Sequence, residues 1–312
     1  MAFLRSVFNP ILKPNKYQTW EDRAVFNPGA TLFGGKFYLL YRAIGEYSKY
    51  ISTVGLAISE DGIHFERFLQ PVLVPEESYE KFGIEDLRIN CIEGKFYLTH
   101  TILSRPATQG GTPHQVGLIE TLDFKNFLRR GPITPKYFCS RNAVLFSEKI
   151  KGKYVLLHRP LYLTQDRYNN QEYPLAPGIW ISYSNDLLHW SEHSLLMEPK
   201  ENWEEEKIGA GPPPIKTNKG WLLIYHGMDK KHTYKAGAAI LDLENPQKVL
   251  YRTKEPILSP EMPYEKEGDV PNVVFPTGLV EKEGILYLYY GAADKTVCLA
   301  TASLEEFLNS LV

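Results

Sequence analysis

The residues best suited to chemistry in this sequence are one aspartate and a set of cations. Asp86 precedes Arg88 by two positions, and three further cations follow far downstream: Arg141, Arg159 and Lys207. A positioned carboxyl group donates a proton to a leaving oxygen, whereas Arg and Lys side chains are the usual ligands of phosphate. Hydrolysis of a glycoside ordinarily needs two carboxyl groups. One acid among surplus cations therefore favours a reaction in which bound phosphate, rather than water, attacks.

These residues need a fold that brings distant segments together, and a repeated sequence motif predicts such a fold. A glycine turn followed by an aromatic and aliphatic run recurs five times, at Gly35, Gly94, Gly152, Gly220 and Gly284. Short runs of this composition, bounded by Gly, Asp, Asn or Pro, are typical of β-strands. Three or four strands in each of five units predict an all-β, five-bladed β-propeller that spans residues 1–312 as a single domain. A solenoid of ~60-residue repeats is the alternative, but neither end of the sequence carries a polar capping unit.

Polar residues that open the first strand or follow the second strand of each unit are predicted to converge on one pocket around the axis. They are Asn27, Arg42, Asp86, Arg88, His100, Arg141, Asn142, Arg159, Lys207, His226, Asn272 and Asp294. The alternative for Arg141, Arg159 or Lys207 alone is a structural pairing with acidic turns, and for His226 alone it is a core histidine. Their shared repeat position favours the pocket. By contrast, Asp61, Asp123 and Asp186 are predicted to be turn residues that bond their own backbone.

Composition excludes several classes of protein. The net charge is -2 and no long Lys/Arg run occurs, so a nucleic-acid binder is excluded. The longest apolar runs fall far below the roughly 18 residues of a membrane span. The first residues have no apolar signal core, and the 3 cysteines form no Cys-x-x-Cys pair that would indicate zinc. We therefore expect a cytoplasmic protein that uses no metal or organic cofactor.

Seven stretches of the sequence carry a family resemblance. They are residues 83–88 (GIEDLR), 141–146 (RNAVLF), 153–160 (KYVLLHRP), 207–212 (KIGAGP), 220–227 (GWLLIYHG), 270–276 (VPNVVFP) and 289–294 (YYGAAD). Together they resemble glycoside hydrolase family 130, whose members are largely β-mannoside phosphorylases with a five-bladed propeller fold. The resemblance covers nearly the whole chain. It departs at Leu87, where the family usually has a proline that would fix the backbone.

The resemblance implies a role for each residue of the predicted pocket. Asp86 matches the general acid of the family. The implied phosphate ligands are Arg141, Arg159, Lys207 and His226, with Tyr234 as a further candidate. The implied substrate-binding residues are Asn27, Arg42, Arg88, Asn142, Phe275 and Asp294.

The activity implied by the resemblance is that of an inverting phosphorylase, which cleaves a β-mannoside with inorganic phosphate and releases α-mannose 1-phosphate. The linkage (β-1,4, β-1,2 or mannosyl-glucose) stays open, because it depends on the long polar loops 104–115 and 161–177. The alternatives are a β-mannosidase of the same family and a non-catalytic sugar-binding propeller. A furanoside-cleaving glycosidase would need an aspartate where this chain has Asn27. The expected partners are a manno-oligosaccharide, phosphate and, by analogy alone, further copies of the chain, but neither nucleic acid nor a membrane.

Overall fold

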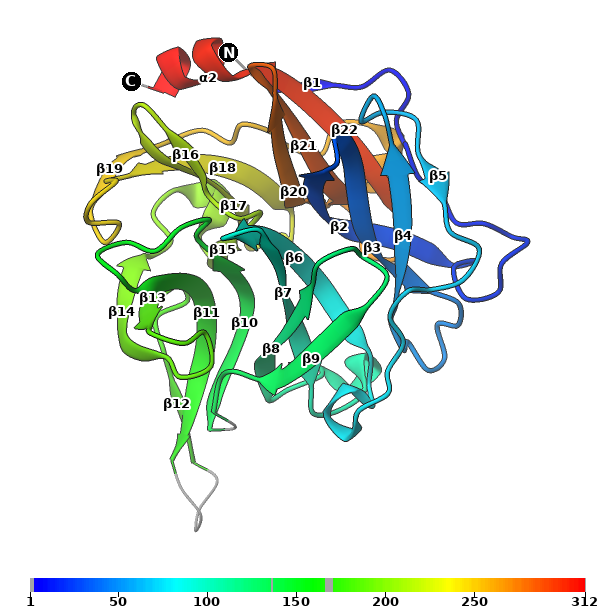
Figure 1. The fold of residues 1–312 in the computed structure, drawn as a ribbon, viewed down its shortest axis with the longest axis horizontal. Coiled ribbons are helices and arrows are strands. Elements are labelled where there is room, and N and C mark those ends of the chain that lie inside the picture. Colours follow the sequence, from blue (N-terminus) through cyan, green and yellow to red (C-terminus); the bar gives the residue numbers. More distant parts are fainter. Residues whose placement is uncertain (1–2, 136, 166–170, 312) are drawn as a thin grey trace.

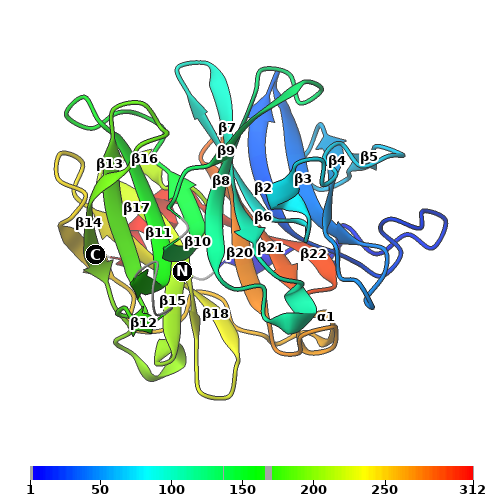
Figure 2. The ribbon, with the colours of Figure 1, turned by 90° about the horizontal axis from the view of Figure 1, so that it is seen from below.

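The computed structural model describes residues 3–135, 137–165 and 171–311, which form five antiparallel sheets around a common axis (Figure 1 and Figure 2). The strands of each blade are given from the inside outwards. Blades 1 and 2 contain β2 (Ala24–Phe33), β3 (Lys36–Ile44), β4 (Thr53–Ser59) and β5 (Glu66–Arg67), and β6 (Ile84–Ile92), β7 (Lys95–Leu103), β8 (His114–Thr121) and β9 (Phe127–Pro132), respectively. Blades 3 and 4 contain β10 (Phe138–Leu145), β11 (Tyr154–Gln165), β13 (Ile179–Ser184) and β14 (Ser191–Met197), and β15 (Lys207–Ala210), β17 (Gly220–Met228), β18 (Tyr234–Leu241) and β19 (Val249–Arg252), respectively; blade 5 contains β20 (Val274–Lys282), β21 (Ile285–Ala292), β22 (Thr296–Ser303) and β1 (Leu4–Arg5). The predicted five-bladed propeller is confirmed.

The remaining elements are short strands and helices at the ends of the blades. They are β12 (Gln171–Pro174) on β11, β16 (Ile215–Thr217) on β17, the 3-10 helices η1 (Ser78–Glu80), η2 (Ala107–Gln109) and η3 (Asn202–Glu204), and the α-helices α1 (Pro263–Lys266) and α2 (Leu304–Leu311). Part of the segment 161–177, expected to be a loop, is instead strand, because β11 continues to Gln165 and pairs with β12.

Blade 5 is built from both ends of the chain. Its outermost strand is β1, in which Leu4 pairs with Thr301 and Arg5 with Ala300 (Figure 1). This pairing closes the ring and protects an edge of β22 that would otherwise be open.

Hydrophobic clusters between neighbouring blades hold the ring together. Leu157 of blade 3 and Leu223 of blade 4 belong to one such cluster, as do Leu222 of blade 4 and Leu288 of blade 5. The strands are therefore buried on both faces, and the hub that they surround is built on close-packed elements.

In each of four blades, a buried ion pair connects the segment that enters the blade to its outermost strand. The pairs are Glu21 with Arg67 (3.1 Å), Glu80 with Arg129 (3.0 Å), Glu204 with Arg252, and Glu265 with Arg5 (2.8 Å). Each glutamate is fully buried in the segment that enters the blade, and each arginine lies on the outermost strand. Because breaking a buried pair costs about 3–5 kcal/mol, these contacts fix the outer strands firmly.

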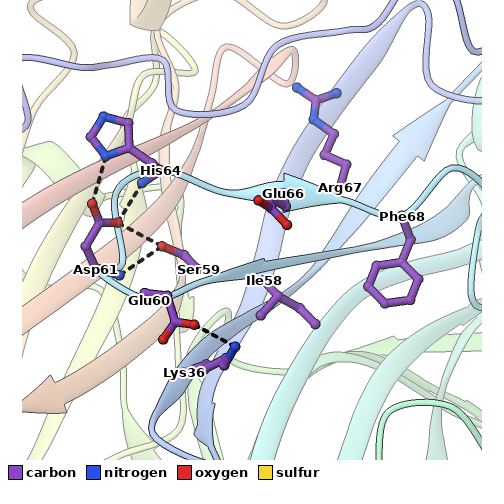
Figure 3. Close-up of a pocket in the computed structure, with 9 residues that line it drawn as sticks. All are labelled: Lys36, Ile58, Ser59, Glu60, Asp61, His64, Glu66, Arg67 and Phe68. Carbon is purple, nitrogen blue, oxygen red and sulfur yellow. Dashed lines mark hydrogen bonds and ion pairs between the residues drawn. The ribbon is translucent and has the colours of Figure 1, made fainter.

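Acidic turns lie at the far ends of the strands, as predicted. Asp61 accepts hydrogen bonds from the backbone N–H groups two and three residues later, and Asp123 and Asp186 do the same. Asp61 lines a cavity of about 490 Å³ in blade 1, and Figure 3 draws the residues that line it. Lys36 lines this cavity, whereas Arg42 lies six residues later on β3, roughly 20 Å away at 3.3 Å per residue. The cavity is thus remote from the residues of the predicted pocket.

Candidate active site

The inner strands of blades 1, 2 and 3 break their regular pairing at the same position. At the three breaks stand Asn27, Asp86 and Asn142, with backbone φ angles of 47°, 53° and 53°. Asn and Asp tolerate this left-handed conformation better than other residues with a side chain. A β-bulge re-aims the side chain that it carries, so the repeat turns these three polar groups towards the hub.

The carboxylate of Asp86 is buried among donors from blades 1 and 3. Asn27 Nδ2 donates to Asp86 Oδ1 over 2.9 Å, and Arg42 Nη1 lies 3.3 Å from the same oxygen. Arg141 Nη2 lies 3.9 Å from Asp86 Oδ2. Only glycine at position 291 leaves room for this arrangement, because a Cβ there would lie 1.9 Å from the Asn27 Oδ1 atom.

Burial and charge act on the pKa of Asp86 in opposite directions. Burial raises the pKa, but nearby guanidinium groups outweigh burial and hold it below its ordinary value. These groups belong to Arg42, Arg88 and Arg141. The unliganded site therefore holds Asp86 as a carboxylate at neutral pH.

Two more carboxyl groups surround Arg42. Arg42 Nη2 donates to Glu85, whose pKa is raised, chiefly by burial. Burial likewise raises the pKa of Asp294 to about 7, against the opposing pull of Arg42. Arg42 Nε also donates to Ser52 Oγ over 2.7 Å, which restrains the guanidinium group.

Blades 3 and 4 supply cations. Arg141 and Arg159 are cross-strand partners on β10 and β11, and Arg159 Nε donates to Asn142 Oδ1 over 3.0 Å. Burial lowers the pKa of Arg159 to about 9, with Arg141 adding to the shift. Burial lowers the pKa of Lys207 to about 7, and both arginines contribute. Burial is the larger cause of both shifts, and the repulsion between neighbouring cations adds to it.

Several buried polar atoms in the hub have no hydrogen-bond partner among the described residues. They are Asn27 Oδ1, Arg88 Nη2, Arg141 Nε, Asn142 Nδ2 and His226 Nδ1. Buried polar groups are ordinarily hydrogen-bonded, so the four unpaired nitrogen atoms beside the cations mark a place for a ligand with several acceptor oxygens, whereas Asn27 Oδ1 can only accept a hydrogen bond.

An aromatic wall completes the cation-rich side. The His226 and Phe275 rings lie 4.3 Å apart, and the Tyr234 and Phe275 rings 5.8 Å apart. Arg88 lies 5.8 Å above Phe275, and Lys207 Nζ lies 5.3 Å from the Tyr234 ring. Tyr234 thus joins the cluster, and Phe275 connects it to the pocket of Asp86 through Arg88.

All the predicted pocket residues except His100 and Asn272 belong to this connected cluster, and Asn272 is exposed just before β20. His100 instead packs over Gly117 on the outer side of blade 2, where Glu80 and Arg129 are its charged neighbours. The inclusion of His100 was wrong, because Thr101 occupies the strand position of Arg42: Phe26 pairs with Arg42, and Glu85 pairs with Thr101. A shift of one residue moves a side chain to the opposite face of a strand.

The residues that support Arg42 could not be predicted from the sequence. Ser52 accepts from its Nε atom, and the Tyr50 ring lies 5.6 Å from its guanidinium carbon. The Tyr50 hydroxyl in turn donates to Asp269. These residues lie in connections that differ between blades, so the repeat gave no signal for them.

In the described part of the chain, no group of three or more His, Cys, Asp or Glu side chains is arranged to hold a metal ion. None of the helices within the described ranges has the length and apolar character needed to cross a membrane.

Comparison with known proteins gives consistent matches over the whole chain. The family model for glycoside hydrolase family 130, described as beta-1,4-mannooligosaccharide phosphorylase, matches residues 5–312. A 1,2-beta-oligomannan phosphorylase of Thermoanaerobacter sp. (strain X514) is 41% identical over 303 residues, covering 95% of this chain and 96% of the relative. A beta-1,2-mannobiose phosphorylase of the same organism is 42% identical over 309 residues, with coverage of 95% and 96%. The solved beta-1,2-mannobiose phosphorylase of Listeria innocua, in complex with beta-1,2-mannobiose, superposes with a TM-score of 0.84 at 29% identity and covers 100% of this chain and 99% of that one.

Proposed function

The chain belongs to glycoside hydrolase family 130, and from that premise we propose that it is an inverting phosphorylase that cleaves β-mannosides with inorganic phosphate. The observation that carries the proposal is the group of three cations, Arg141, Arg159 and Lys207, beside Asp86, whose carboxylate lies 3.9 Å from Arg141. The unpaired donors of the hub fit the oxygens of phosphate.

In the proposed reaction, the terminal mannose lies between the carboxyl groups around Arg42 and the cations of blades 3 and 4. Phosphate held by Arg141, Arg159, Lys207 and His226 attacks the anomeric carbon through one oxygen, and the bond from that carbon to the leaving oxygen breaks. Asp86 gives its proton to the leaving oxygen. Attack on the face opposite the leaving group inverts the configuration, so the products are α-mannose 1-phosphate and the shortened acceptor.

Phosphate has a second effect in this proposal, on the acid itself. Arg141 contacts the Asp86 carboxylate and belongs to the cation group as well. The negative charge of bound phosphate offsets the pull of the cations and so raises the pKa of Asp86. The acid would thus gain its proton when the nucleophile is in place.

The remaining pocket residues are proposed to hold the sugar. Asn27, Arg42 and Asp294 provide donors and acceptors for mannose hydroxyl groups, and Phe275 packs on the sugar ring. Arg88 and Asn142 lie between this side and the cations, through the contacts of Arg88 with Phe275 and of Asn142 with Arg159. The proposal includes phosphate as co-substrate, no metal or organic cofactor, and a cytoplasmic location.

A β-1,2 linkage is the preferred substrate in this proposal, because both Thermoanaerobacter relatives are named for β-1,2-linked substrates. A β-1,4 linkage is the second candidate, since the family model carries that description. The test is a panel of β-1,2- and β-1,4-mannobiose incubated with and without phosphate. We expect mannose 1-phosphate only when phosphate is present, and faster from the β-1,2 compound. Equal release of free mannose without phosphate would identify a hydrolase, and binding without turnover a sugar-binding propeller.

A further inference from the structure

Blade 3 differs from the other four blades at the position of the buried ion pair. In blades 1 and 5, a second-strand tyrosine hydroxyl donates to the buried glutamate: Tyr41 to Glu21 over 2.7 Å and Tyr290 to Glu265 over 2.8 Å. Among the described residues of blade 3, no Glu–Arg pair takes this place. His158 occupies the second-strand position there, because its neighbour Arg159 pairs with Arg141 as Arg42 pairs with Phe26.

A chain of three side chains replaces the ion pair. Ser140 Oγ lies 2.8 Å from His158 Nδ1, and His158 Nε2 lies 3.1 Å from His193 Nδ1 on the outer strand β14. The Phe138 ring packs edge-on against both imidazoles, at centroid distances of 5.4 and 4.9 Å. Ser140 and His158 are fully buried, so the chain crosses the blade from its inner strand to its outer strand.

The inner end of this chain is attached directly to the cation group. Ser140 precedes Arg141 on β10, and His158 precedes Arg159 on β11. The pairing of β10 with β11 is irregular on both sides of this point, between Cys139 and Ser140 and again after Arg141. Ser140 also faces Pro160, which has no N–H group to donate. The side-chain contact therefore ties the two strands together where their backbone ladder is weakest.

We propose that His158, held between Ser140 and His193, is a positioning residue that sets the spacing of Arg141 and Arg159 for phosphate. This inference rests on the proposed function, because it assigns a support to the phosphate site of that function. His158 does not itself contact the ligand. It acts through the backbone of the two strands that carry the arginines.

The two histidines keep this support of blade 3 uncharged. Burial lowers the pKa of His158 to about 3, with His193 adding to the shift, and burial also lowers the pKa of His193. Both rings are thus neutral near pH 7, so the chain supports the strands and leaves the arginine charges to the ligand.

The test compares Ser140→Ala with a matched variant in another blade. Ser140→Ala removes the hydrogen bond to His158 and is expected to raise the KM for phosphate about 10-fold, while the KM for the mannoside changes less than about 2-fold. Tyr290→Phe removes the equivalent hydrogen bond in blade 5. It is expected to lower the melting temperature by a similar amount and to leave both KM values near those of the wild type.

Two outcomes would overturn the inference: a phosphate KM in Ser140→Ala within about 2-fold of the wild type, or an equal rise in both KM values. If Ser140→Ala does not fold, His193→Asn on the half-buried outer strand takes its place with the same expected split. A wild-type enzyme that needs no phosphate would refute the proposed function instead, and it would do so before any variant is made.

Discussion

The two sides of the hub use corresponding strand positions for opposite charges. In blades 1, 2 and 5, the carboxyl groups of Glu85, Asp86 and Asp294 surround Arg42. In blades 3 and 4, Arg159 and Lys207 stand together, and no carboxylate of the described residues forms an ion pair with either. Arg141 lies between the two sides and contacts Asp86. The blades thus share one backbone geometry but carry side chains of different charge. The carboxyl groups around Arg42 form the acid side of the site, and the cations of blades 3 and 4 form its anion-binding side, called the anion side.

The largest effect should come from the acid side. Asp86→Asn keeps the shape of the carboxyl group but cannot donate the proton, so turnover should fall at least about 100-fold. Phosphate should bind as tightly or more tightly, because the carboxylate that shares Arg141 is gone. Steady-state kinetics and a phosphate titration measure the two effects. Asp123→Asn, which removes a turn carboxylate from the outside of blade 2, is the control and should keep full turnover. An Asp86→Asn enzyme with wild-type turnover would contradict the division of the hub.

Removing a cation from the anion side should weaken the binding of phosphate rather than that of the mannoside. Arg159→Ala or Lys207→Ala should raise the KM for phosphate by about 10- to 100-fold, since a hydrogen bond to a charged group contributes about 1.5–3 kcal/mol. The KM for the mannoside should change less than about 2-fold. Initial rates over a grid of both substrates separate the two constants. If the mannoside KM rises instead, the anion side has been assigned to the wrong residues.

A smaller effect should appear on changing the pH. The pKa of Lys207 is lowered to about 7, so below pH 7 the ammonium form prevails and above it the neutral form. The phosphate KM should therefore rise as the pH increases from 7 to 8. Lys207→Arg keeps its charge in this range and should flatten the profile, even if its phosphate KM at pH 7 is higher. The same slope in the variant and the wild type would rule out Lys207 as the titrating group.

The sequence predicted the fold and most of the site for one physical reason: the repeat shows which residues share a position. Asp86, Arg141 and Asn142 lie in a polar segment that opens a first strand, and the structure brings them together through bulges that polar Asn and Asp residues tolerate. Their exact partners depend on side-chain contacts, but their convergence follows from the period.

Features outside the repeat could not be predicted in this way. β1 pairs with β22 although almost the whole length of the chain separates them, and its two residues are too few to form a recognisable sequence pattern. Ser52 and Tyr50 support Arg42 from a connection that has its own length in each blade. His100 was misassigned because successive side chains of a strand point to opposite faces. An error of one residue therefore places a side chain on the wrong face.

The most direct test is a calorimetric titration of inorganic phosphate into Asp86→Asn protein saturated with β-1,2-mannobiose, in which both ligands occupy the hub without reaction. The account predicts one phosphate per chain, and binding at least about 10-fold weaker when Arg159→Ala is added. Asp294→Asn, added in its place, should leave phosphate affinity within about 2-fold. Phosphate binding that is unaffected by Arg159→Ala, or that is weakened more by Asp294→Asn, would contradict the claim that the cations of blades 3 and 4 hold the nucleophile.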